Sequence, residues 1–233
     1  MPSIDEVAER IAAAGAPALF LDTCILLDII RSTHRCLPNY AARASELLTL
    51  ASNVPPTCVV IVSSIVPHEW NTNAKGVTDD VDRHMIEMEE QSSHFHDACQ
   101  ALDISVPFGR ANYGHWGLVE KLRNLSQNIL DRAIHLDADH ESRVRAVERV
   151  ISNRPPSRNR GEVKDCAIIE ECLAICRGSD AAGFAGKRVF CTSNTRDYCE
   201  TGGRLHPALD TEFAACNLTF TTNLAWAIHE ITH

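Results

Sequence analysis

The chain has 233 residues, of which 45% are apolar and 23% charged, which is ordinary for a packed globular protein and argues against a disordered chain. Its formal net charge of −9 disfavours general, charge-driven adhesion to nucleic acid. The ten cysteines form no Cys-x-x-Cys pair, so we expect reduced, mostly buried thiols.

The N-terminal segment has the features of neither a membrane span nor an export signal. Its apolar stretch, residues 11–21, is too short to cross a bilayer. The preceding residues Asp5, Glu6 and Glu9 are acidic where a secretory signal would be basic. We therefore expect a cytoplasmic protein that has no membrane partner.

Helices and strands are predicted to alternate along the first third of the chain. Ser3 and Glu6 have the spacing of a capping box at the start of the first helix. In chain order we expect a helix ending near Gly15, a strand at 18–21, a helix at 40–51, a strand at 59–62 and a helix that starts near Pro67. Glu69 then lies near the N-terminus of a helix that follows a strand.

The rest of the chain begins with a long helical pattern. It runs from residue 76 to 152, and we interpret it as a helical insertion within a single domain that spans residues 1–233. After a polar, arginine-bearing loop we expect a helix from about Asp165, strands at 187–192 and 218–221, and a helix at 224–231 capped by Asn223. Strands that alternate with helices predict an α/β fold with a mainly parallel sheet.

Four acidic residues lie at strand ends or helix starts: Asp22, Glu69, Asp165 and Asp197. In open parallel sheets the carboxyl ends of the strands form ligand sites, so we expect these acids to gather at one edge. Crowded carboxylates repel one another and are costly to desolvate unless a cation is present. Oxygen ligands of this kind suit Mg²⁺ or Mn²⁺ as the cofactor.

Four segments resemble, in the same order, the motifs of PIN-domain nucleases. They are residues 19–27, 63–69, 164–169 and 192–198. The resemblance spans about residues 17 to 221. It implies a three-layer α/β/α domain whose acidic pocket binds Mg²⁺ or Mn²⁺ and cleaves RNA phosphodiesters.

The resemblance also implies roles for individual residues. Asp22, Glu69 and Asp165 would be metal ligands, directly or through water, and Asp197 would be the fourth acid of a catalytic set. Asn194 stands where many members of the family have an acid. Its carbonyl oxygen can ligate a metal but carries no charge, which leaves a second metal ion open.

Each acid also has a purely structural alternative. Asp22 would cap a helix, Glu69 and Asp165 would favour the macrodipole at helix starts, and Asp197 would stabilise a turn. Glu170 lies about 140° around the helix from Asp165, and we expect it at the surface.

Charge is distributed unevenly along the chain. Residues 143–164 carry seven basic residues against two acids, whereas residues 79–103 carry eight acids against Arg83. The basic stretch is either a solvated face or a path for the substrate. Four of its members precede Asp165 and are predicted to contact substrate phosphates: Arg154, Arg158, Arg160 and Lys164.

These features favour a metal-dependent endoribonuclease whose partner is an RNA substrate. One alternative is a catalytically weak PIN-like module for RNA binding or protein docking. Another is a toxin nuclease that a protein inhibitor holds inactive, and a homo-oligomer is also open. The sequence does not distinguish RNA from DNA as the substrate.

Overall fold

A sheet of five parallel strands, in the order β3-β2-β1-β4-β5, lies at the centre of the protein. The computed structural model describes residues 1–106, 109, 112–157 and 163–233. The strands are β1 (Ala18–Leu21), β2 (Val59–Val62), β3 (Ile134–His135), β4 (Arg188–Cys191) and β5 (Leu218–Thr221). Every residue of β1, β2 and β4 is buried, as expected for parallel strands that are covered on both faces.

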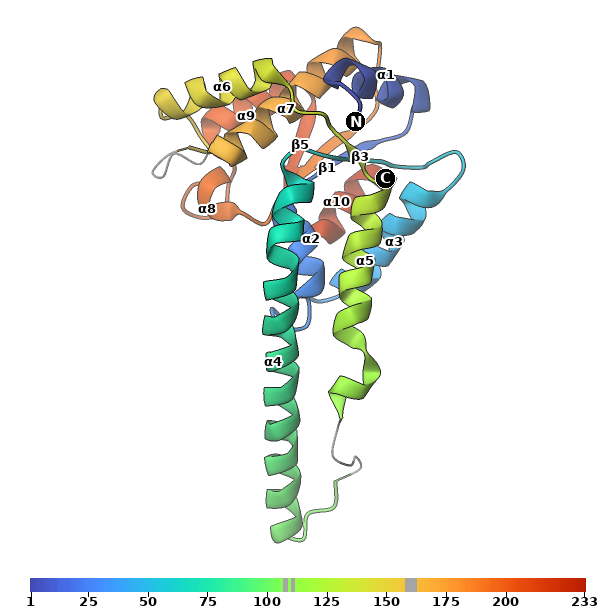
Figure 1. Ribbon diagram of the computed structural model, residues 1–233, viewed down its shortest axis with the longest axis vertical. Helices are drawn as coiled ribbons and strands as arrows, with labels where there is room; N and C mark the ends of the chain where they lie inside the picture. The colour runs from blue at the N-terminus through green and yellow to red at the C-terminus, as the bar shows by residue number, and fades with distance from the viewer. Residues whose placement is uncertain (107–108, 110–111, 158–162) are drawn as a thin grey trace.

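Helices cover both faces of this sheet. They are α1 (Ile4–Ala14), α2 (Thr23–Ile30), α3 (Tyr40–Ser52), α4 (Val66–Ala101), α5 (Leu118–Arg132), α6 (His140–Ile151), α7 (Val163–Ala181), α8 (Thr195–Tyr198), α9 (Pro207–Ala215) and α10 (Leu224–Thr232). Figure 1 shows α1, α6, α7 and α9 on one side of the sheet and α2, α3, α5 and α10 on the other. The predicted three-layer α/β/α architecture is confirmed.

The strands end in register at the edge where the acids were expected. Leu21 of β1 pairs with Val62 of β2 on one side and with Cys191 of β4 on the other. The residues that follow these strand ends therefore lie at the same level. Among them are Asp22 after β1 and Thr192 after β4.

Helices α4 and α5 form a hairpin that projects from the body of the protein (Figure 1). At 36 residues, α4 is about 54 Å long. Where the hairpin meets the body, the indole of Trp70 donates a hydrogen bond to the Ser126 hydroxyl at 2.9 Å, and that hydroxyl donates to the Leu26 carbonyl at 2.7 Å. These buried bonds join α4, α5 and α2.

Several elements differ from the sequence-based predictions. The segment 76–152 is not helical throughout, because it contains β3, which pairs with β2, and a short 3-10 helix, η1 (Tyr113–Trp116). β3 has only two residues, too few to leave a recognisable strand pattern. Helices α8 and α9 were also not predicted, and α2 was expected only in the alternative in which Asp22 caps a helix.

The burial of the cysteines and the composition of the helices bear on the expected buried thiols and on the expected absence of a membrane span. Eight of the ten cysteines are buried, and Cys36 is exposed. In the ranges that the structure describes, no helix is both long and apolar enough to cross a membrane.

Candidate active site

Asp22 lies at the end of β1 and is almost fully buried, with 4% of its surface exposed. It is the N-cap of α2, and its Oδ1 accepts a hydrogen bond from the Thr23 backbone N–H at 2.6 Å. Its Oδ2 accepts a second one from the Thr192 hydroxyl, also at 2.6 Å. Asp22 therefore caps a helix and at the same time links the ends of β1 and β4.

The surroundings of Asp22 disfavour its negative charge. Burial raises the pKa of Asp22, while hydrogen bonds from Thr192, Cys24 and Thr23 oppose the rise and the charge of Glu69 adds to it. A buried carboxylate that also senses a second carboxylate is stabilised by a nearby cation. A cation beside Asp22 would therefore offset the unfavourable charge of its buried carboxylate.

Glu69 lies in the first turn of α4 and is joined to Asp22 through Thr23. The Thr23 hydroxyl donates to Glu69 Oε2 at 2.8 Å, while the backbone N–H of the same residue binds Asp22. The other oxygen, Oε1, lies 3.1 Å from Lys164 Nζ. Lys164 comes from the start of α7, and 62% of its side chain is exposed.

Residues after β4 connect this pair to Asp165 in the first turn of α7. Thr192 Oγ1 accepts a hydrogen bond from the Asn194 backbone N–H at 3.1 Å. The side-chain amide of Asn194 donates to Asp165 Oδ2 at 3.4 Å. One hydrogen-bonded chain therefore joins the three acids, in the order Glu69, Thr23, Asp22, Thr192, Asn194 and Asp165.

Asp197 is close to this chain in sequence, but its carboxylate is not part of it. Its backbone N–H donates to Asn194 Oδ1 at 3.4 Å, so Asn194 caps α8. Within the described part of the protein, no hydrogen bond or ion pair links the Asp197 side chain to Asp22, Glu69 or Asp165. Its place as a fourth acid therefore stays a prediction.

The donor types suit a hard divalent cation, because carboxylate, hydroxyl and amide oxygens are the ligands that Mg²⁺ and Mn²⁺ prefer. Across residues 1–106, 109, 112–157 and 163–233, however, no three His, Cys, Asp or Glu side chains form a ready set of metal ligands. Protein donors take the carboxylate oxygens instead, including the Thr23 and Thr192 hydroxyls and the Lys164 ammonium group. The acids and Asn194 therefore have the oxygen ligands that Mg²⁺ or Mn²⁺ requires. In this structure, protein hydrogen-bond donors occupy some of the carboxylate oxygens that the cation would bind.

Three uncharged residues of the site were missed by the sequence analysis: Thr23, Cys24 and Thr192. The Cys24 thiol lies 3.3 Å from Asp22 Oδ2 and accepts a hydrogen bond from the Ser193 N–H at 3.0 Å. Burial raises the pKa of Cys24, so it remains a protonated thiol that donates to Asp22. The only signal for these residues was their position beside a strand end.

Within the described part of the basic stretch, Arg145, Arg149, Arg154 and Lys164 are engaged in ion pairs. Arg158 and Arg160 lie outside the described residues. Arg154 pairs with Glu212 of α9 at 3.9 Å, and Lys164 alone of the described members contacts one of the predicted acids, Glu69.

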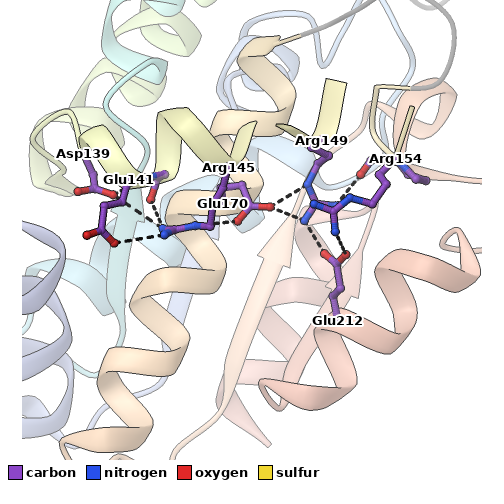
Figure 2. Close-up of polar contacts among 9 residues, drawn as sticks. Asp139, Glu141, Arg145, Arg149, Arg154, Glu170 and Glu212 are labelled. Carbon is purple, nitrogen blue, oxygen red and sulfur yellow. Dashed lines mark hydrogen bonds and ion pairs between the residues drawn. The ribbon is translucent and has the colours of Figure 1, made fainter. Parts of the chain in front are cut away.

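Arg149, which the sequence analysis did not single out, is the centre of a buried network (Figure 2). It is 2% exposed, and its Nε and one terminal nitrogen donate to Glu170 Oε1 at 2.9 and 2.6 Å. It also binds Glu212 Oε2 at 2.6 Å and the Pro155 carbonyl at 2.7 Å. The prediction that Glu170 lies at the surface is wrong, because Glu170 faces α6 and binds both Arg149 and Arg145.

Comparison with known proteins gives the family. The model of the PIN domain matches residues 19–198, which is well over half of the chain and includes every residue of the hydrogen-bonded chain. The chain belongs to the PIN-domain family. PIN domains are usually nucleases that use divalent metals, so the match supports a nuclease-like fold. No curated protein and no solved structure matches this PIN-domain protein significantly.

Proposed function

We propose that this PIN-domain protein is a Mg²⁺- or Mn²⁺-dependent endoribonuclease of the cytoplasm. The observation that carries the proposal is the hydrogen-bonded chain that joins Asp22, Glu69 and Asp165 at the carboxyl edge of the sheet. Parallel sheets form ligand sites at this edge. Glu69 and Asp165 also lie in the first turns of α4 and α7.

In this proposal Asp22, Glu69 and Asp165 hold the metal, and Asn194 adds its carbonyl oxygen. Asp197 is the fourth acid, on the short helix that Asn194 caps. A bound divalent cation would offset the charge that develops on phosphate oxygens and would activate a water molecule. Thr23 and Thr192 orient the carboxylates by donating to them.

Substrate binding is assigned to cationic side chains near the start of α7. Lys164 places an exposed ammonium group beside Glu69, where it can contact a phosphate next to the acids. The proposal extends to Arg154, whose side chain is 48% exposed beside Glu212, and to Arg158 and Arg160.

A second candidate is a catalytically weak PIN-like module that binds RNA or docks a protein. Two observations favour it: Lys164 already neutralises Glu69, and Asn194 brings no negative charge. A protein inhibitor or a homo-oligomer fits either candidate.

The two candidates are separated by a cleavage assay on end-labelled single-stranded RNA, structured RNA and DNA of matched sequence. For an endoribonuclease we expect internal cuts in RNA that need Mg²⁺ or Mn²⁺ and are abolished by EDTA. Metal-independent RNA binding without any cut would favour the second candidate. Cuts in DNA at the same rate would reassign the substrate.

A further inference from the structure

The hairpin of α4 and α5 contains a groove that the proposed active site does not use. The groove has a volume of about 420 Å³ and lies between α4 and the segment formed by η1 and the start of α5. Ile86 of α4 is 17 positions beyond Glu69, which corresponds to about 25 Å along the helix. Figure 1 shows this part of α4 well away from the start of the helix.

The groove has an apolar floor. Met85 is buried, while 55% of Ile86 is exposed, and Leu118 lines the opposite side. Near the groove, 59% of Trp116 is exposed, and its ring packs edge-on against Tyr113 at 5.1 Å between centroids. Exposed apolar residues around a hollow of this kind are typical of a protein-binding surface.

The walls of the groove are negatively charged. Asp82, Glu89 and Glu120 line it, against one base, Arg123. Glu89 accepts a hydrogen bond from the Gly114 N–H at 2.7 Å. No ion pair engages Asp82 or Glu120 within the described residues. The surrounding segment, residues 79–103, carries eight acids against Arg83, so the charge of the groove continues along α4.

We propose that this groove binds a basic amphipathic helix of a partner protein. An apolar side chain of that helix packs between Ile86, Met85 and Leu118, and its Lys or Arg side chains meet Asp82 and Glu120. A groove between two helices is a common receptor for a helix whose anchors repeat every three or four residues. Complementary charge then selects a basic partner and speeds its association.

Other occupants match the groove less well. RNA is disfavoured because the acids of α4 repel phosphate. A second copy of the chain offers α6 as its basic helix. Arg145 and Arg149 of that helix are, however, already bound by Glu170 (Figure 2).

The proposal is tested by selecting random 18-residue peptides on the full-length protein and measuring the affinity of the most enriched one by fluorescence anisotropy. We expect net positive peptides with Leu, Ile or Phe at helical spacing. Ile86→Asp should weaken binding at least about tenfold, and Asp82→Asn with Glu120→Gln about five- to tenfold. Glu87→Gln with Glu90→Gln is the matched control, because it removes the same charge from exposed positions that do not line the groove. It should change binding less than about twofold.

Several results would overturn the proposal. They are the absence of enriched peptides, enrichment of neutral or acidic ones, and equal losses in the groove and control variants. Sedimentation that shows a dimer lost in Ile86→Asp would assign the groove to a second copy instead. Circular dichroism checks that each variant is folded. If Ile86→Asp does not fold, the peptide affinity of the variant with Asp82→Asn and Glu120→Gln decides the outcome.

Discussion

At the residue scale, Asp22 combines two roles that were alternatives in the sequence. It caps α2 through the Thr23 N–H, and it belongs to the hydrogen-bonded chain through the Thr192 hydroxyl. A structural role and a place in the site are compatible because the carboxylate has two oxygens that accept separate donors. The linking residues Thr23 and Thr192 could not be singled out from the sequence, since uncharged hydroxyls are common beside strand ends.

Replacing Asp22 by Asn should stabilise the metal-free protein at neutral pH. Burial raises the pKa of Asp22, so its contribution to stability is fully present below its unfolded pKa, near 4, and is lost as pH rises through the higher folded value. The uncharged Asn avoids that loss. Thermal unfolding in EDTA should show a higher midpoint for Asp22→Asn at pH 7 and a much smaller gap at pH 4.

The exposed exchange Glu9→Gln is the control, and its unfolding midpoint should follow that of the wild type at both values of pH. Added Mn²⁺ should then stabilise the wild type and leave Asp22→Asn nearly unchanged. A wild type more stable than Asp22→Asn at pH 7 in EDTA would contradict this account of the carboxylate.

Replacing Lys164 by Met should have opposite effects on two ligands. The ammonium group neutralises Glu69 at 3.1 Å, so its loss should raise Mn²⁺ affinity by about two- to fivefold, as expected for a partly exposed ion pair. RNA binding should weaken, with a salt dependence shallower by about one phosphate contact. Calorimetry and fluorescence anisotropy measure the two affinities.

Lys187→Met removes the same charge from an exposed position just before β4, at the other end of the strand. It should leave the Mn²⁺ affinity within error of the wild type. Equal behaviour of the two lysine variants toward both ligands would remove Lys164 from the site.

At the scale of elements, apolar runs and capping residues in the sequence predicted several strands and helix ends correctly. The strands at 18–21 and 59–62 have the predicted bounds, because buried parallel strands are continuous apolar runs. The strand at 218–221 also has the predicted bounds, although its pattern is only partly apolar and partly buried. The capping box of Ser3 and Glu6 and the cap by Asn223 are also confirmed.

Local sequence patterns could not predict ion pairs between residues that are far apart in the sequence. Glu170 and Glu212 lie 21 and 63 positions from Arg149. The charge of the basic stretch was visible in the sequence, but its neutralisation depends on how α6, α7 and α9 pack together.

The Arg149 network should contribute strongly to the stability of these helices. Arg149→Met leaves Glu170 buried with fewer donors, and we expect a loss of about 3–5 kcal/mol in the free energy of unfolding. Urea denaturation measures this loss. Arg143→Met, at an exposed position of the same helix, should change stability by less than about 0.5 kcal/mol. Similar losses in the two variants would show that the network is not a source of stability.

Two helical glycines should respond in opposite ways to Ala. A Cβ on Gly178 of α7 would lie 2.9 Å from the Ala8 Cβ of α1, so Gly178→Ala should destabilise the protein by about 1–3 kcal/mol. Apart from its chain neighbours and the backbone of α4 itself, no heavy atom of the described residues lies within 4 Å of a Cβ on Gly76. Gly76→Ala should therefore stabilise by about 0.5–1 kcal/mol. The free energies of unfolding in urea test both, and a stabilising Gly178→Ala would contradict the close packing of α1 on α7.

At the scale of the whole molecule, the chain separates two surfaces. The carboxyl edge of the sheet gathers Asp22, Glu69 and Asp165, and the hairpin carries an acidic, partly apolar groove along α4. The first follows from topology, since parallel strands in register end at one edge. The second was visible in the sequence only as a run of acids, because the groove forms where α4 meets η1 and α5.

The measurement that tests the central claim most directly is anomalous diffraction from a crystal soaked in Mn²⁺. Our account predicts a peak within about 2.0–2.6 Å of carboxylate oxygens from Asp22, Glu69 and Asp165, with Lys164 displaced from Glu69. The same peak should be lost or much weaker in Asp165→Asn. A strong peak elsewhere, or none beside these three carboxylates at saturating Mn²⁺, would contradict a metal-dependent nuclease site at this edge of the sheet.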